Sequence, residues 1–210
     1  MTPRTRLVLG GVCVVVGAAL MLLGADVWRI GANMRESDAR FALAPADGEL
    51  WSPTRLVPFG AAERVLRLED DLAYRRAVRL FVLGRPREQP YSDTEVIAQR
   101  GRAQELLEEI VGSDQIPARR SAASNLVGAL GFANAALDES AQASYLQDAV
   151  EDFQTAIVID PENDDAKYNL EVALERLASA QKSSDEQPPP QDSRGGSGAG
   201  SGTGRPGSGY

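Results

Sequence analysis

Histidine is absent from this 210-residue sequence, and cysteine occurs once, as Cys13 within an apolar run. The chain therefore cannot form a histidine-containing zinc site, a Cys/His nucleophile pair or an imidazole acid–base centre. A single cysteine also excludes a disulfide within the chain. Lysine occurs only as Lys167 and Lys182, and the formal charge of −8 is spread along the sequence. Because nucleic-acid binding needs clustered basic residues, the composition argues against a nucleic-acid partner.

Carboxylates are plentiful, but their placement does not favour an active site. Asp70 and Asp71 fall within an expected helix, and Asp164 and Asp165 fall in the first turn of another, where carboxylates stabilise the helix dipole. The stretch "DPENDD" begins like a calcium-binding loop, but it lacks the glycine at the sixth position and places Glu171 within a helix at the twelfth. No phosphate-binding glycine loop follows a strand. We therefore expect no catalytic residue, metal site or cofactor.

An uncharged apolar run, "LVLGGVCVVVGAALMLLGA", covers residues 7–25. At the rise of an α-helix this run reaches about 28 Å, close to the hydrocarbon thickness of a bilayer. Trp28 follows where an aromatic residue would lie at the membrane surface. We predict a transmembrane anchor over residues 1–28. A cleaved signal peptide is the alternative, although the run is longer than an ordinary signal-peptide core and lacks a small-residue cleavage pattern.

Positive charges around this run favour one orientation of the anchor. Arg4 and Arg6 precede the run, and Arg29, Arg35 and Arg40 follow it. The terminal amine, together with the acidic residues beside the downstream arginines, favours an amino terminus inside the cytoplasm. We therefore expect a single-pass protein of the cell membrane whose remaining residues lie outside the cytoplasm.

The rest of the chain is expected to form an all-α domain over residues 61–182. Residues 29–60 are predicted to be a juxtamembrane connector, since residues 41–60 contain three prolines and two glycines and show no periodicity. Apolar residues then recur at helical spacing in five segments, over residues 61–84, 92–112, 116–137, 142–159 and 160–177. Ser92 and Glu95 have capping-box spacing, and Pro117 suits a first helical position. Residues 183–210, rich in Gly, Ser and Pro, are expected to be a disordered tail.

The C-terminal third contains the spacing of a helical repeat. An alanine, a phenylalanine four residues later, a small residue and a helix-ending proline occur at Ala149, Phe153, Ala156 and Pro161. This pattern resembles the second helix of a tetratricopeptide (TPR) repeat, and the following helix, with Leu170 and Leu174 in "KYNLEVAL", resembles the first helix of a further repeat. The resemblance implies a short array of antiparallel helix pairs with these six residues in its core.

The upstream part of the array departs from the ordinary TPR length. "SNLVGAL" resembles the same first-helix stretch, and aligning the two stretches matches Leu126 with Leu170. These leucines are 44 residues apart, ten more than the usual TPR period of about 34 residues. Ten residues are close to three helical turns, so a pair of lengthened helices would keep the same faces inward.

The last helical stretch, "DPENDDAKYNLEVALERL", is expected to end the array as a cap. Asn163 suits the N-cap position of this helix. Its apolar stripe is formed by Ala166, Leu170, Ala173, Leu174 and Leu177. Stacked repeats need a terminal helix with one apolar and one polar face, so we predict that this stripe covers Phe153 and Ile157.

The same stretch is also similar to one in bacterial membrane-anchored TPR proteins of the Bat type. Their genes accompany a MoxR-type ATPase and membrane proteins with von Willebrand factor A domains. This resemblance covers less than a third of the chain. It implies a scaffold or accessory role in a cell-envelope complex that includes such partners, and it implies no enzymatic activity.

In TPR arrays the first helix of each pair lines a groove that binds protein segments. The corresponding residues here are Arg120, Ser124, Asn125, Gly128, Asp165, Tyr168, Asn169 and Val172. Asn125 and Asn169 are equivalent and are each expected to hydrogen-bond a bound peptide, unless they are ordinary polar surface residues. Ser124 and Tyr168 occupy the places where some members carry the basic residues that bind a peptide carboxylate. The alternative to a binding groove is a structural membrane protein whose helices self-associate into a homo-oligomer.

Overall fold

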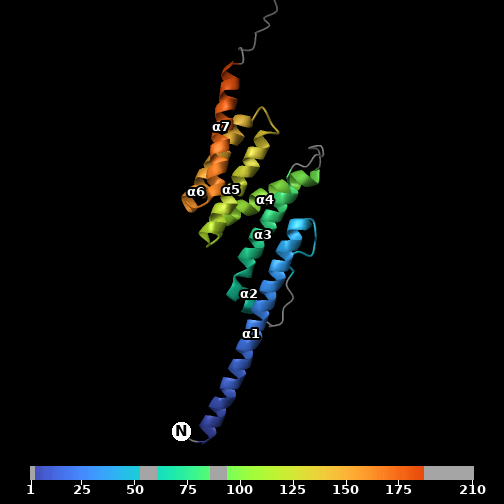
Figure 1. Cartoon of the computed structure of the whole chain (residues 1–210), viewed down its shortest axis with the longest axis vertical. Helices are drawn as coiled ribbons and strands as arrows, with labels where there is room; N and C mark the ends of the chain where they lie inside the picture. Colours follow the sequence, from blue (N-terminus) through green and yellow to red (C-terminus); the bar gives the residue numbers. More distant parts are fainter. Residues whose placement is uncertain (1–2, 53–60, 86–93, 187–210) are drawn as a thin grey trace, which may run out of the picture.

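The computed structural model describes residues 3–52, 61–85 and 94–186, and all regular secondary structure in these ranges is helical (Figure 1). The all-α class is thereby confirmed for this part of the chain. The helices are α1 (Pro3–Leu43), α2 (Ala61–Leu66), α3 (Leu68–Leu83), α4 (Thr94–Ser113), α5 (Pro117–Ala135), α6 (Gln142–Ile159) and α7 (Asp164–Glu186). The molecule is elongated, with α1 at one end and the C-terminal end of α7 at the other (Figure 1).

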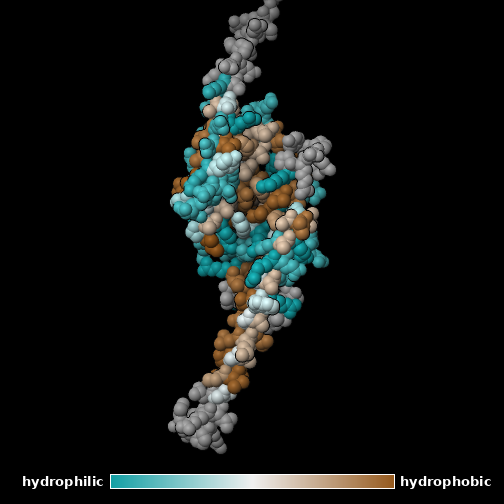
Figure 2. Space-filling model, in the orientation of Figure 1, coloured by the Kyte–Doolittle hydropathy of each residue, from teal (hydrophilic) through white to brown (hydrophobic). Residues whose placement is uncertain are grey.

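Helix α1 contains the apolar segment in its N-terminal half and continues beyond it as a stalk that leads to the rest of the molecule. It is long and apolar enough to cross a membrane, and its side chains from Gly10 to Leu22 are exposed, so Figure 2 shows a bare hydrophobic rod. The helix has 41 residues, and a helix of this length extends about 60 Å, twice the hydrocarbon thickness of a bilayer. Residues 29–43, expected as part of the connector, instead continue the helix without a break.

The second half of α1 packs against the base of the helical domain. The buried residues of this base cluster are Ile30, Met34, Leu50, Trp51, Ala62 and Leu68, and Leu23, Val27, Phe41 and Leu72 pack around them. On α1, Leu23, Val27, Ile30 and Met34 are spaced every three to four residues, as in a coiled coil. Four residues of the expected connector, Ile30, Met34, Leu50 and Trp51, are thus part of a core, while residues 53–60 lie outside the described ranges.

Trp51 fixes the chain that returns from α1. Its φ of 55° lies in the left-handed region, which is unfavourable for a bulky residue. Three contacts offset this strain. The Trp51 backbone N–H donates to Ser37 Oγ at 3.2 Å, its indole Nε1–H donates to Asp38 Oδ1 at 2.8 Å, and its ring lies 5.2 Å from the ring of Phe41. The turn after α1 is therefore held back against the stalk.

The helix expected over residues 61–84 is divided in two. Arg67 separates α2 from α3 with a φ of 49°, and its guanidinium donates to Gln115 Oε1 at 2.9 Å. The break lets Ala62 on α2 and Leu68 on α3 both enter the base cluster. Beyond it, the expected end at Gly84 is confirmed, since α3 stops at Leu83. Ser92, expected to cap the next helix, lies outside the described residues.

Helices α3 to α7 form a stack with a regular contact pattern. Each helix contacts the next one in the chain, and α5 also contacts both α3 and α7. Within the described residues, α4 and α6 make no contact with each other. The core between α3, α4 and α5 is built from residues such as Ala77, Phe81, Leu107, Ile110 and Leu130. Helices α3, α5 and α7 therefore form one layer, and α4 and α6 pack against it without contacting each other in the described part of the chain.

A chain of ion pairs connects the stalk with this stack. Asp38 on α1 pairs with Arg75 on α3, and Arg75 Nε lies 2.8 Å from Asp71 Oδ2. Asp71 Oδ1 lies 3.5 Å from Arg119 Nη1 on α5, and Arg119 Nε lies 2.8 Å from Asp114 Oδ2. Burial raises the pKa of Asp71 above its usual value, although Arg119 opposes the shift. Three elements far apart in sequence are joined by this network.

Candidate protein-binding groove

Close packing of α5 against α6 builds the centre of the candidate site. Phe153 is 1 % exposed, and Ala149 and Ala156 are fully buried. A Cβ atom added to Gly128 would lie only 2.7 Å from the ring of Phe153. Gly128 therefore allows the phenylalanine ring to lie directly against the α5 backbone, because any side chain there would overlap the ring.

Two serines of α5 attach this helix to the backbone of α6. Ser121 Oγ donates to the carbonyl of Ala156 at 2.8 Å, and Ser124 Oγ donates to the carbonyl of Asp152 at 2.8 Å. Both serines are almost fully buried. Their hydroxyl groups are thus satisfied by carbonyls of α6, as buried polar groups need to be.

Helix α7 covers the α5–α6 pair. Asn163 Oδ1 accepts a hydrogen bond from the Ala166 N–H at 3.0 Å, which confirms the predicted N-cap. Ala173 is buried against Phe153, and Leu170 and Leu177 pack around it. The predicted stripe is wrong at one position, since Leu174 is 45 % exposed. Pro161, which was also expected in the repeat core, is likewise exposed.

The eight predicted groove residues lie on two helices, with Arg120, Ser124, Asn125 and Gly128 on α5 and Asp165, Tyr168, Asn169 and Val172 on α7. Ser124 and Gly128 face the interior between α5 and α6, so they are packing residues and not part of an open surface. Arg120 donates to the Val111 carbonyl at 2.7 Å and joins α5 to α4. Four residues on α7 remain accessible to different degrees, with Asp165 and Tyr168 exposed and Asn169 and Val172 half-buried.

The two equivalent asparagines contact each other. Asn169 Nδ2 donates to Asn125 Oδ1 at 2.9 Å across the α5–α7 contact. Asn125 is 9 % exposed. The pairing follows from the parallel course of α5 and α7, which brings residues 44 apart in sequence side by side. One hydrogen-bonding group of each amide is therefore used within the chain and does not face a ligand.

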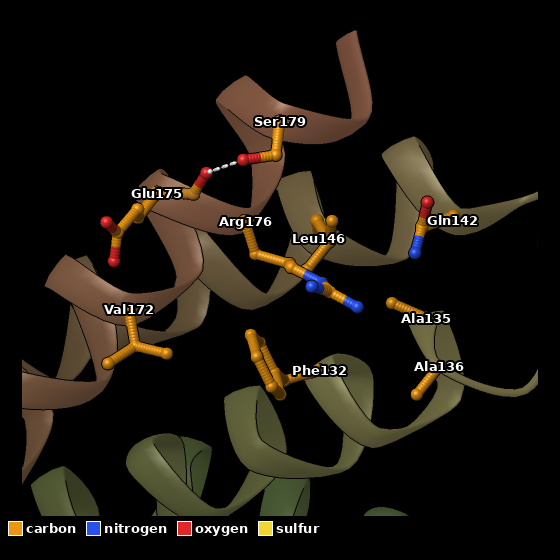
Figure 3. A pocket seen from close by; sticks show the side chains of 9 residues that line it. All are labelled: Phe132, Ala135, Ala136, Gln142, Leu146, Val172, Glu175, Arg176 and Ser179. Atoms are coloured by element: carbon orange, nitrogen blue, oxygen red, sulfur yellow. Dashed lines mark hydrogen bonds between the residues drawn. The ribbon is translucent and has the colours of Figure 1, made fainter. Parts of the chain in front are cut away.

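A pocket of about 390 Å³ opens beside this contact, between the C-terminal end of α5, the start of α6 and the middle of α7 (Figure 3). Its walls are largely apolar and are formed by Phe132, Ala135, Ala136, Leu146 and Val172; its polar residues are Gln142, Glu175, Arg176 and Ser179. Figure 3 shows the Arg176 side chain extending from α7 across the pocket, toward Ala135 and Gln142.

Arg176 is exposed and lies beside the apolar walls of the pocket. Among the described residues, the ion pairs are made by other side chains and do not include Arg176. The pocket thus combines apolar walls with a cation that forms no ion pair with the carboxylates of residues 3–52, 61–85 and 94–186. Of its lining, sequence reasoning identified only Val172. Helical spacing could have added Arg176 and Ser179, which follow Val172 by four and seven residues on the same face.

A second hollow, of about 410 Å³, lies where α4 and α6 diverge over α5. Glu108, Asp148 and Asp152 are among its lining residues. The pKa of Asp152 is raised from its ordinary 3.8 to about 6, chiefly by burial and also by the neighbouring carboxylates of Glu108, Asp148 and Glu151. Within the described ranges, no set of His, Cys, Asp or Glu side chains is arranged to hold a metal ion.

The Asp152 carboxylate should make the domain less stable as it ionises. Because its pKa is raised on folding, the folded state is favoured below pH 3.8 and loses stability as the pH rises through about 6. We expect Asp152→Asn to stabilise the protein at pH 7 by about 1 kcal/mol, a value reduced for solvent screening. Denaturant unfolding at pH 4 and pH 7 would measure this. An unchanged pH dependence in the variant would assign the slope to another group.

Comparisons with family models, curated proteins and solved structures were then made for the whole chain. None of the three gave a match. The geometry of the groove and the apolar part of α1 are therefore the features that bear on function.

Proposed function

We propose that this protein is a membrane-anchored protein-interaction module that acts as a scaffold in a bacterial cell-envelope complex. The apolar part of α1 would anchor it, and the TPR-like stack of α3 to α7 would bind a protein segment outside the cytoplasm. The observation that carries the proposal is the pocket between α5, α6 and α7, with its apolar walls and an Arg176 that makes no ion pair within the described part of the chain. Such a surface suits a peptide side chain that is apolar and lies near a carboxylate.

The partners proposed from the resemblance are von Willebrand factor A domain membrane proteins that work with a MoxR-type ATPase. The proposal includes no catalytic step, cofactor or nucleic acid. It is supported by the position of the pocket at the end of the molecule away from the apolar rod, where another envelope protein could reach it (Figure 1).

Site-directed photocrosslinking in the bacterial membrane would test the groove. A photoreactive phenylalanine analogue at position 172, within the pocket, should crosslink a protein other than this chain. The matched control is position 158 on α6, where Val158 is 81 % exposed but outside the pocket. Arg176→Glu should reduce the crosslink at position 172 several-fold, because it reverses the charge in the pocket. Equal yields from both positions would reject the groove as the binding site.

A second function, self-association of the membrane helices, is favoured by a different observation. Gly10, Gly17 and Gly24 recur every seven residues along α1, and no atom lies within 4 Å of a Cβ added at any of them. Small residues at such spacing let transmembrane helices approach closely. A homo-oligomer formed in this way would be weakened by Gly17→Leu, and crosslinks from position 172 would then join only copies of this chain.

The proposed orientation has an independent test. Alkaline phosphatase fused after Ala180 should be active, because this enzyme folds only outside the cytoplasm. A fusion that is inactive while a fluorescent protein at the same position is bright would place the helical domain inside.

A further inference from the structure

The base of the helical domain lies beside α1 close to the end of its apolar run. Leu23 and Val27 of α1 pack around the cluster that contains Ala62 of α2. The uncharged run ends at Ala25. Ile30, which is buried in the same cluster, comes five residues later, about 7.5 Å further along the helix axis. This rise is similar to the thickness of one headgroup layer, which is about 5–7 Å.

The short helix α2 therefore has a defined depth if the apolar run spans a bilayer. Helix α2 contacts α1, and the cluster that includes its Ala62 also has Leu23, from the last turn of the run, and Val27, from the turn that follows, packed against it. Figure 1 shows α2 beside α1 at the lower limit of the domain, with the bare part of α1 below it. At this depth the base of the domain would lie at the membrane surface.

Exposed side chains at this level have the chemistry of a membrane surface. Trp28 on α1 is 73 % exposed, and Leu66 at the end of α2 is 38 % exposed. Arg29 and Arg64 are also exposed. In the described part of the chain, neither arginine takes part in an ion pair, whereas Arg75 and Arg119 higher in the domain do. Tryptophan and arginine at the end of a spanning helix favour the headgroup region.

We propose that α2, together with the turn of α1 around Trp28, forms a contact with the bilayer surface. Leu66 inserts among the headgroups, and Arg29 and Arg64 bind lipid phosphates. The domain consequently rests on the membrane and does not stand away from it on a free stalk. This inference depends on the proposed anchoring by α1, and it adds a second, peripheral contact made by a segment that is not part of the span.

Spin labelling of the full chain in vesicles tests the contact. In a Cys13→Ser background, Leu66→Cys is labelled with a nitroxide in vesicles of phosphatidylcholine and phosphatidylglycerol. Collision with a water-soluble nickel complex should be several-fold lower at position 66 than at the control position, Leu174→Cys, which is exposed on α7. Collision with dissolved oxygen should be higher at position 66. A label at Arg64→Cys provides a second reading if Leu66→Cys does not fold.

Trp28 distinguishes failure of this contact from failure of the anchor. Lipids brominated near the headgroup should quench the fluorescence of the wild type more than that of Trp28→Phe, in which only the buried Trp51 remains. If Trp28 is quenched but position 66 is as accessible to nickel as position 174, the domain stands clear of the bilayer and the contact is rejected while the anchor stands. If Trp28 is not quenched, the anchor itself is rejected, and the contact with it.

Discussion

Replacing Arg119 with alanine should lower the free energy of unfolding by about 3 kcal/mol, because it removes one partner from a buried ion pair and leaves the others uncompensated. Arg119 is 14 % exposed and Asp114 is 4 % exposed at the side chain. The same guanidinium is also the α5 partner of Asp71, whose pKa is already raised by burial. Without Arg119, two carboxylates would remain close together with less positive charge between them. Urea unfolding followed by circular dichroism measures the loss.

The matched control is Lys167→Ala, which breaks an ion pair with Asp164 on the surface. That pair joins residues three apart on α7, and the Asp164 side chain is 90 % exposed. Exposed pairs contribute about 0–1 kcal/mol, so the control should unfold almost as the wild type does. If the two variants lose the same stability, the network between α1, α3 and α5 is only a surface feature and does not hold the domain together.

Gly128→Ala should destabilise the protein by about 1–3 kcal/mol, although alanine is ordinarily the better residue in a helix. The added methyl group would lie 2.7–3.0 Å from three ring carbons of Phe153. The ring cannot move freely, since it is 1 % exposed and lies among Ala149, Val150 and Ala173. The helices α5 and α6 would have to separate, and thermal unfolding would report the loss as a lower melting temperature.

Gly131→Ala is the control, because it makes the same change one turn further along the same helix. There the nearest atoms to an added Cβ lie at 3.4 Å or more, which is ordinary contact. This variant should be neutral or more stable by up to about 1 kcal/mol. A second check combines Gly128→Ala with Phe153→Leu, since a smaller side chain should relieve part of the overlap. Equal destabilisation by both alanine variants would show that Phe153 does not require a glycine opposite it.

Local signals in the sequence were sufficient to predict most helices. The predicted segment over residues 142–159 has the bounds of α6, and Asn163 caps α7 as its side chain suggests. Both depend on interactions between residues a few positions apart, which sequence spacing shows directly. The long apolar helix could be predicted for the same reason, since an apolar run of sufficient length is a local property.

Contacts between distant residues could not be predicted in this way. The connector was predicted to be irregular because of its prolines. In the structure, however, Trp51 hydrogen-bonds to Ser37 and Asp38 of α1 and is buried in the base cluster. Asn125 was placed on a ligand-binding face, but it pairs with Asn169, 44 residues away. Gly128 was likewise placed in the groove, because sequence alone does not show that its missing side chain accommodates Phe153. In each case the deciding partner comes from another helix.

The unbroken course of α1 couples the rotation of its exposed apolar half to that of the domain. No bend or loop lies between the exposed residues near Val16 and the buried Ile30 and Met34, so the two parts keep one helical phase. Successive residues of an α-helix differ by about 100° around the axis. One residue inserted after Leu22 would therefore turn the groove by about 100° relative to the apolar half of α1, whereas seven inserted residues would return it to within about 20° and only lengthen the helix. The direction in which the groove faces is in this sense determined by the number of residues in the apolar half of α1.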